Sequence, residues 1–364
     1  MAVTTYGVNA PEAQKLWSRR VAEQAIAKTY FGRFMGESAS DLIQIYPETG
    51  RDQGDRVRVP FRGLLTSDGV GGDGKLKGNE ESLTTFTDDV LIDQTRNAVN
   101  IGGRMSRQRV PWDIREQAEQ ALSDWFAEVM DDSFFKQLGG DILADDSNLT
   151  RTGNNAVTTI PVDTYHFRAD AAGTHFIDSS VDDDDLVAGD TMRLKHIDQL
   201  VAKAKQASPI FKPIRANGQD FFVMFLGTNA ALNLRIQADA VHSWQAIQQA
   251  AISGGQVENN PIFTGALGVY NNVIIHESTR VPGGITVAGA AKADTERNIF
   301  CGAQAAAVAF GMDNGPERFT WVEELDDFEN ELGIAVGSIF GMKQLTFNSK
   351  PHANFIFSTH NNSA

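Results

Sequence analysis

A glycine-rich stretch at residues 69–75 carries the most suggestive chemistry in the chain. Its sequence, GVGGDGK, matches the first seven positions of the phosphate-binding loop G-x-x-x-x-G-K-[ST]. The eighth position needs a serine or threonine to hold Mg²⁺, but Leu76 stands there. Such a loop also opens a helix whose N-terminus faces the phosphates, and residues 77–79 continue without a helical pattern. We therefore predict the tip of a flexible arm and no nucleotide site.

A second group with possible chemistry is a run of four aspartates, with Asp178 and Asp190 nearby. Carboxylates are the ligands that Ca²⁺ prefers, but this run lacks the alternating ligand spacing and the central glycine of an EF-hand loop. The pattern favours a solvated acidic loop. An alternative stays open, in which a divalent ion binds at a contact between subunits. The weak candidate ligands for such an ion are Asp182, Asp183, Asp184 and Asp185.

The remaining chemical groups form no recognisable reaction centre. The seven histidines show no H-E-x-x-H pattern, and no G-x-S-x-G elbow is present. Cys301 lies in an apolar run, which predicts a buried and inert thiol. The acidic residues 326–331 are typical of a turn before a strand. We expect a protein that is not an enzyme and that needs no cofactor and no metal.

Composition narrows the class further. The chain has 364 residues, 41% of them hydrophobic, and it lacks both a run of about 18 apolar residues and a signal-peptide pattern. These features argue against a membrane or secreted protein. One cysteine allows no internal disulfide and fits a reducing compartment. This length predicts two packed lobes with appendages.

Charge is unevenly distributed along the chain. The net charge is -15, yet residues 1–115 hold 16 Lys and Arg against 15 Asp and Glu. A specific DNA or RNA reader needs a basic binding face, so the acidic remainder argues against that function. The near-neutral N-terminal third is expected to lie against the acidic part of a neighbouring copy. The alternative is that both sets of charges only keep separate faces solvated.

Residues 51–110 are predicted to form a long hairpin. Residues 55–62 alternate charged and apolar side chains, residues 82–92 also favour a strand, and the glycine-rich stretch separates them. An isolated two-stranded arm is marginally stable in water. We expect its covering surface to belong to another chain.

The hairpin leads into a long amphipathic helix. Asp113 is the expected N-cap with Glu116 as its capping-box partner, apolar residues recur every three or four positions, and Gly139 and Gly140 end the helix. An earlier helix is expected to start near Asn9. Further expected helices cover residues 194–206, 229–235 and 240–253. Expected strands cover residues 221–226, 270–276, 318–325, 333–340 and 343–347, and residues 298–310 form a buried strand or helix.

Several long ungapped blocks resemble the major capsid proteins of coliphage N4-like tailed phages. They read TTYGVNAPEA with LWS at residues 4–18, LKGNEESLTT at residues 76–85, and GRMSRQRVP at residues 103–111, before the Asp113 helix. The resemblance extends over nearly the whole chain in the same order.

This resemblance implies an α+β fold of the Hong Kong 97 (HK-97) capsid type. The implied parts are an N-terminal arm at 1–48, an extended loop at 49–110 that lies over an adjacent subunit, and a peripheral-domain spine helix at 111–140. A loop-rich insertion at 141–190, an axial domain at 191–310 and peripheral-domain return strands at 311–364 follow. No long scaffolding segment is expected ahead of the arm.

The implied function is structural: self-assembly into the icosahedral shell of a virion, put together in the host bacterial cytoplasm. The implied partners are further copies in hexamers and pentamers, scaffold, portal and decoration proteins, and double-stranded DNA enclosed without sequence-specific binding. No membrane partner is expected. The expected contact residues between subunits are Gly69, Gly71, Gly72, Gly74, Lys75, Lys77, Arg104, Arg107, Arg109, Trp17, Arg19 and Arg20.

Two alternatives stay open at this stage. A cellular nanocompartment shell of the same fold would enclose enzyme cargo, and neighbouring portal, terminase and tail genes would argue against it. A soluble metal-dependent enzyme using the acidic loop would be a metal-loaded monomer.

Overall fold

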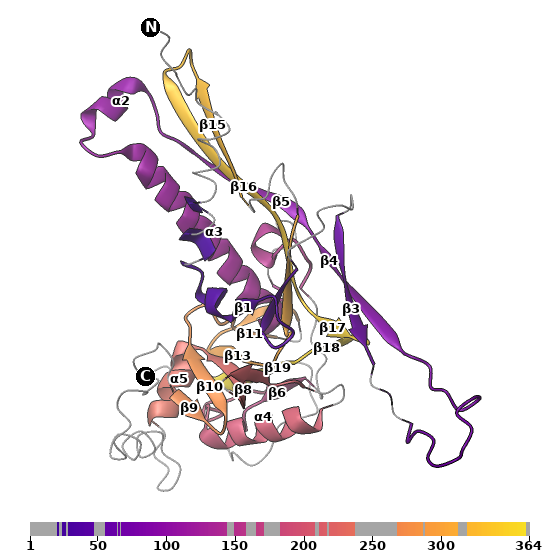
Figure 1. The fold of residues 1–364 in the computed structure, drawn as a ribbon. Helices are drawn as coiled ribbons and strands as arrows, with labels where there is room; N and C mark the ends of the chain where they lie inside the picture. Colours follow the sequence, from indigo (N-terminus) through magenta and orange to yellow (C-terminus); the bar gives the residue numbers. More distant parts are fainter. Residues whose placement is uncertain are drawn as a thin grey trace.

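The computed structural model is an elongated molecule in which a long helix and a tall sheet stand on a smaller α/β lobe, with an arm projecting to one side (Figure 1). The long helix is α3 (Ile114–Gly139). The structure describes residues 20–21, 24–26, 28–46, 55–63, 65, 67–143, 149–157, 165–170, 183–207, 211–216, 218–236, 268–286, 288–311 and 319–361.

Helix α3 forms where its sequence predicts. The Asp113 side chain accepts a hydrogen bond from the backbone N–H of Arg115, which satisfies a free donor of the first turn. Gly140 ends the helix in the left-handed conformation that glycine adopts without steric cost. Most of the expected apolar stripe is buried, with Phe126, Phe134 and Leu138 in the core, whereas Ala121 is exposed.

Helix α3 packs against the first sheet, whose strand order is β1-β2-β14-β16-β15, with β5 paired to β16. Parallel pairs join β1 to β2 and β2 to β14, and the other pairs are antiparallel. The strands are β1 (Met35–Gly36), β2 (Ile43–Tyr46), β5 (Asp93–Asn100), β14 (Ala306–Phe310), β15 (Thr320–Asp326) and β16 (Glu331–Gln344).

The second sheet forms the core of the smaller lobe, in the order β6-β19-β13-β8-β10-β9, with β7 paired to β8. Helices α4 (Leu194–Gln206) and α5 (Thr228–Ile236) pack on it, as Figure 1 shows. Its strands are β6 (His166–Arg168), β7 (Ile214–Ala216), β8 (Gln219–Leu226), β9 (Gly268–Tyr270), β10 (Val273–Glu277), β13 (Thr295–Cys301) and β19 (Asn354–His360).

Short elements complete the described fold. They are the 3-10 helices η1 (Tyr30–Phe34) and η2 (Leu149–Thr152), the helix α2 (Arg104–Arg109), the arm strands β3 (Arg56–Arg62) and β4 (Thr85–Leu91), and the pairs β11 (Gly284–Ile285) with β12 (Ala291–Lys292) and β17 (Thr346–Phe347) with β18 (Lys350–Pro351). Among the described residues, no helix is both long enough and apolar enough to cross a membrane.

Several expectations from the sequence need correction. Residues 298–310 form two strands in different sheets, and the two strands expected at 333–347 are the long β16 followed by the short β17. Strands β5 and β19 and helix α2 were not expected, and the hairpin predicted for residues 51–110 ends at Leu91, because the chain then pairs with β16 and forms α2. The two sheets also do not divide at residue 310, because β14 lies in the first sheet and β19 returns to the second. The helices expected near Asn9 and at 240–253 lie mostly or wholly outside the described residues.

Candidate functional site

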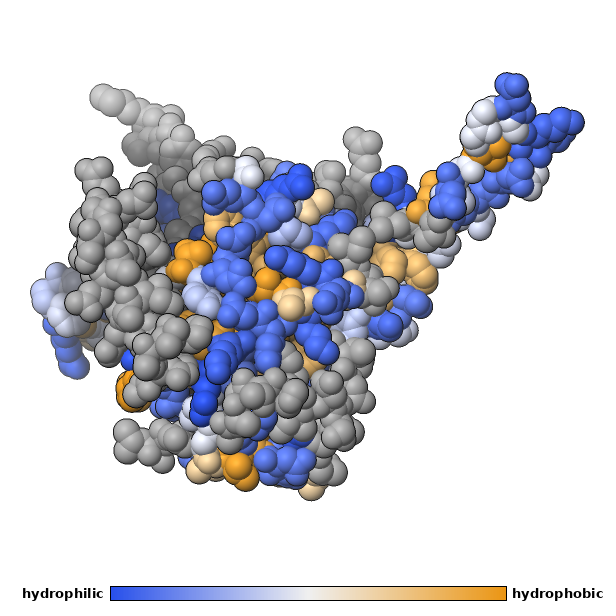
Figure 2. Space-filling model, turned by 90° about the horizontal axis from the view of Figure 1, so that it is seen from below, coloured by the Kyte–Doolittle hydropathy of each residue, from blue (hydrophilic) through white to orange (hydrophobic). Residues whose placement is uncertain are grey.

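The arm is the feature with the clearest capacity for contact with another molecule. Strands β3 and β4 pair in antiparallel register from Arg56 with Leu91 to Arg62 with Thr85. Beyond them the described residues from 63 to 84 form only turns and extended chain, and most are exposed. Leu65, Leu76 and Leu83 place exposed apolar side chains on this otherwise hydrophilic projection (Figure 2). Exposed apolar side chains on a projection of this kind mark a candidate contact surface.

The tip does not have the structure of a phosphate-binding loop. No helix begins after Lys75; the chain turns again at Lys77 and Gly78, and Asn79 N–H donates to the Leu76 carbonyl. Gly69 and Gly72 have positive φ angles, and an added Cβ at either would meet nothing within 4 Å. The expected contact residues of the tip all lie on this projecting segment: Gly69, Gly71, Gly72, Gly74, Lys75 and Lys77.

The root of the arm is covered by its own chain, which corrects the expectation of a covering surface on another chain. Alternate residues of β3 point inward and are buried together with Val90 and Ile92. Ala307 and Ala309 of β14, with Leu345, complete this hydrophobic cluster. Only the part beyond the strands is left without a covering surface of its own among the described residues. The root therefore fixes the direction in which the tip projects.

Asp88 adds a polar anchor at the same root. This buried carboxylate on β4 pairs with Lys343 Nζ at 2.5 Å through Oδ1, and Oδ2 accepts hydrogen bonds from the backbone N–H and hydroxyl of Thr346, both at 2.8 Å. The Asn155 side chain bonds to both the N–H and the carbonyl of Leu91. These contacts tie β4 to the sheet that packs on α3.

We expect Asp88→Ala to loosen the arm at its root. The change removes the carboxylate that pairs with Lys343 and accepts from Thr346, and leaves Lys343 only its hydrogen bond to the Asp89 carbonyl, which should cost about 2 kcal/mol. Hydrogen exchange followed by mass spectrometry should then show faster exchange in β3 and β4. Asp89→Ala is the matched control, since Asp89 pairs with Arg58 on the exposed face. Equal exchange in the two variants would contradict the anchoring role of Asp88.

The basic residues expected at the hairpin root lie on the short helix α2. Arg107 donates to the Asn330 carbonyl at 3.0 Å, and Arg104 lies 3.8 Å from the Glu329 carboxylate in the β15–β16 turn. Both contacts are within one chain and largely exposed. Arg109 is also exposed. Trp17 and Arg19 lie outside the described residues, and Arg20 is exposed near the start of the described chain.

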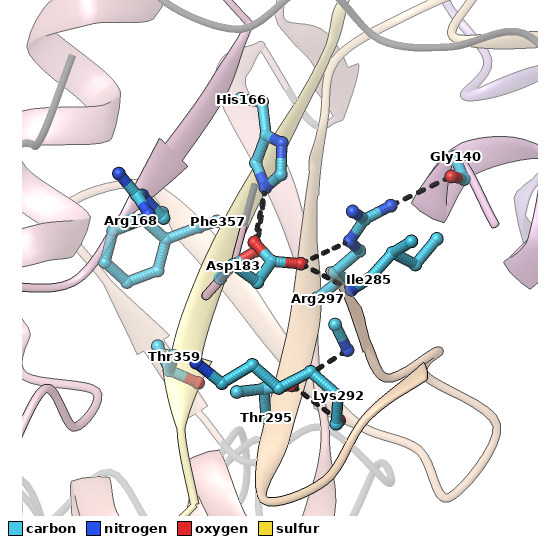
Figure 3. A network of polar contacts seen from close by, with 12 residues as sticks. Gly140, His166, Arg168, Asp183, Ile285, Lys292, Thr295, Arg297, Phe357 and Thr359 are labelled. Atoms are coloured by element: carbon cyan, nitrogen blue, oxygen red, sulfur yellow. Dashed lines mark hydrogen bonds and ion pairs between the residues drawn. The ribbon is translucent and has the colours of Figure 1, made fainter. Parts of the chain in front are cut away.

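The acidic run is not uniformly solvated, which corrects a second expectation. Asp183 is fully buried, and its Oδ2 accepts hydrogen bonds from Arg297 Nε and from the Ile285 N–H, both at 2.9 Å (Figure 3). His166 Nε2 lies 3.3 Å from Asp183 Oδ1. Asp184 and Asp185 are exposed, as expected, and Asp182 lies outside the described residues.

The Asp183 network joins the long helix to the smaller lobe. Arg297 on β13 also donates to the carbonyl of Gly140, the C-cap of α3, at 2.9 Å. Burial alone would raise the pKa of Asp183, but the hydrogen bond and charge of His166, the charge of Arg297 and the Ile285 N–H hold that pKa well below its usual range. In the described part of the chain, no three potential metal-ligating side chains are grouped as an ion would require. The contacts of Asp183 connect β13, the β11 strand and His166 of β6.

Asp131 on α3 holds the segment that precedes the first sheet. Its carboxylate accepts hydrogen bonds from the N–H groups of Tyr30 and Phe31, at 3.0 and 3.4 Å, at the start of η1. Burial raises the pKa of Asp131 to about 6, against the lowering effect of these two hydrogen bonds and of Arg280. The ring of Phe31 packs against Phe134 and Phe135 of the same helix.

This raised pKa predicts a pH dependence of folding. The native state binds a proton on Asp131 that the unfolded state releases near pH 4, so this group's contribution to stability falls as the pH rises from about 4 to about 6. Urea unfolding across that range should show a contribution of about 2 kcal/mol that Asp131→Asn removes. The comparison of wild type with the variant isolates this group from other titrations. Parallel pH profiles for the two proteins would contradict it.

Cys301 is buried, and burial raises the pKa of its thiol, as expected for an inert cysteine. Sequence reasoning missed Asp88, Asp131 and the partners of Asp183. The available signals were weak: Asp131 stands on the inward side of the helical pattern, and Arg297 directly precedes residues 298–310, which the sequence predicts to be buried.

The chain is similar in sequence and in structure to known phage capsid proteins. The family model described as phage capsid protein matches residues 5–360. The major capsid protein of Pseudomonas phage KPP25 is 30% identical over 354 residues, covering 93% of this chain and 90% of that protein. The capsid of Ralstonia phage GP4 superposes with a TM-score of 0.76 at 31% identity, covering 100% of this chain and 99% of the other. The cyanophage Pam1 capsid subunit, 20% identical, gives a TM-score of 0.71 over 93% and 94% of the two chains.

Proposed function

The chain belongs to the phage capsid protein family, and from that premise we propose that its projecting arm lies over an adjacent subunit in the shell. The protein is a major capsid protein of a tailed phage; it is structural and not an enzyme, and its fold is of the Hong Kong 97 type. The phage shell is therefore favoured over the nanocompartment and the soluble enzyme.

The observation that carries the proposed role of the arm is the contrast between its root and its tip. The root is fixed by a buried cluster and by Asp88, whereas the described part of residues 63–84 is largely exposed and carries Leu65, Leu76 and Leu83 on its surface. A rigid root that presents an uncovered apolar segment suits a contact between subunits, because burying those side chains on a neighbour stabilises the assembly.

Hydrogen exchange tests this role. Backbone amides in residues 63–84 should exchange rapidly in unassembled subunits and become protected in assembled shells, while amides of the arm strands change little. The strands β3 and β4 are the internal control, since their hydrogen bonds exist in both states. Equal exchange of residues 63–84 in subunits and shells would contradict the proposed contact.

The basic residues of α2 are proposed to add charge pairing between subunits. Arg104, Arg107 and Arg109 lie at an exposed end of the molecule, beside the turn of their own chain. Replacing all three by alanine should lower the yield and stability of particles. Unchanged particles would show that the basic face is only solvated.

The remaining proposals are those that the resemblance of the sequence to N4-like major capsid proteins implies. The proposed subgroup is that of the N4-like tailed phages, the proposed capsomers are hexamers and pentamers, and assembly takes place in the host cytoplasm with scaffold, portal and decoration proteins. The lobe built on β8, β13 and β19 is the proposed axial domain, and α3 with the first sheet is the proposed peripheral domain. The net charge of -15 suits enclosure of DNA without sequence-specific binding.

A further inference from the structure

The turn between β15 and β16 exposes a large aromatic side chain at the end of the molecule opposite the smaller lobe. Phe328 has a relative exposure of 102%, so its ring touches essentially nothing of its own chain. Val322 and Leu325 on β15 are also exposed. A fully exposed aromatic side chain at a protruding tip is unusual on a surface that faces only water, and it marks a candidate contact site.

The backbone holds Phe328 outward at a conformational cost. Asp327, Phe328 and Glu329 all have left-handed φ angles, of 48°, 52° and 67°, which costs roughly 1–2 kcal/mol for each residue other than glycine. The turn is fixed by hydrogen bonds from the Asn330 N–H to the Asp327 carbonyl and from the Asn330 side chain to the Asp327 carboxylate. Strain that the structure maintains at a protruding aromatic residue is a reason to look for a role.

A complementary surface lies at the same end of the molecule. Met105 on α2 is 62% exposed, Trp112 in the link between α2 and α3 is 56% exposed, and Arg109 at the end of α2 is exposed as well; we call this region the corner. Helix α2 contacts the β15–β16 turn through Asn330, and Figure 1 shows the two elements together at the end farthest from the smaller lobe.

The charges of the two surfaces are opposite. The tip carries Glu324, Asp326 and Asp327, and no ion pair to any of these three is present within the described ranges. The corner is basic, with Arg104, Arg107 and Arg109 on α2. An acidic tip with an aromatic centre fits a basic corner with an aromatic residue and a methionine, because apolar contact and charge pairing then favour the same register.

We propose that the Phe328 tip of one copy docks on the Met105–Trp112 corner of a second copy. The inference rests on the proposed self-assembly and adds a contact that does not involve the arm. The contacting patches differ, so the contact is heterologous, and it repeats around a rotation axis that passes close to this end of the molecule. Each copy then contributes one tip and one corner.

The first test replaces the exposed ring. Phe328→Ser should leave the thermal midpoint of unassembled subunits unchanged and shift the ratio of assembled to unassembled protein about tenfold toward subunits, as loss of an interface anchor does. Val269→Ser removes an exposed apolar side chain on β9 of the smaller lobe and is the matched control. Sedimentation of both variants gives the ratio. If the Phe328→Ser variant assembles to the same extent as wild type, the proposal is overturned, while the role of the arm is unaffected.

The second test identifies the partner surface. Tagged copies with Phe328→Cys are assembled with untagged copies with Trp112→Cys, and a short bis-maleimide is added; the native Cys301 is buried. The expected product is a dimer that contains one chain of each kind. Cross-linking only between Phe328→Cys chains would show that tips meet tips, and a lack of any mixed dimer would place the tip elsewhere; either result overturns the proposal.

Discussion

A chain that lacks residues 69–78 is expected to fold normally and to form no closed shells. The deletion removes the glycine-rich end of the arm, including Lys75 and Lys77, and leaves β3, β4 and the buried root unchanged. Because residues 69–78 are exposed apart from the half-buried Val70, their loss should remove little folding free energy. Thermal unfolding of unassembled subunits should stay within a few degrees of wild type, as about 1 kcal/mol or less implies for a domain of this size.

Assembly should respond very differently. Each subunit of a shell would lose one contact, and the losses multiply over every copy, so a modest loss per contact abolishes the closed particle. Negative-stain images and sedimentation of the expressed protein give the yield of particles. An equal-length Gly/Ser replacement of residues 69–78 keeps the reach of the arm and removes its side chains. We expect this control to recover assembly only in part. Normal particles from the deletion would contradict the role of the tip.

The second large effect is expected from Asp183→Ala. This change leaves Arg297 buried without its carboxylate partner and removes the acceptor of the Ile285 N–H. Breaking a buried ion pair by removing one member typically costs about 3–5 kcal/mol. The urea midpoint of the unassembled subunit should fall accordingly, and the end of α3 should lose protection from hydrogen exchange because Arg297 also holds the Gly140 carbonyl.

Two further variants distinguish the effect of the buried ion pair from the effect of removing any acidic residue of the run. Asp184→Ala removes a neighbouring exposed carboxylate and should change the unfolding free energy by less than about 0.5 kcal/mol. Asp183→Leu combined with Arg297→Met removes both charges and should recover much of the loss, because neither member of the ion pair is then left buried alone. A single Asp183→Ala variant as stable as Asp184→Ala would show that the network contributes nothing.

Local signals predicted the helices α3 and α4, whereas α2 was not expected. Asp113, the apolar spacing and Gly140 define α3 without help from the rest of the chain, and residues 194–206 were expected as the helix that α4 forms. Strand β5 was missed because its sequence, DQTRNAVN, is mostly polar, and it is a strand because it pairs along the length of β16. Strand β19 likewise depends on β13, a partner far away in sequence.

The same distinction explains the site residues. Four consecutive aspartates indicate a solvated loop, and nothing in the local sequence shows that Asp183 turns inward to Arg297, which is 114 positions away. The burial of the arm root by its own chain could not be predicted from the sequence either. The residues that bury it, Ala307, Ala309 and Leu345, lie more than 200 positions later in the chain. Capping, helical periodicity and arm composition are local properties, whereas burial of a charge or of a hairpin face is decided by tertiary packing.

A near-atomic reconstruction of the assembled shell by electron cryomicroscopy tests the central claim most directly. The account predicts that the root of each arm stays packed on β14 and Leu345 of its own subunit, while residues 63–84 lie on the surface of an adjacent subunit. A shell in which residues 63–84 fold back on their own subunit, or extend into solvent without touching a neighbour, would contradict it.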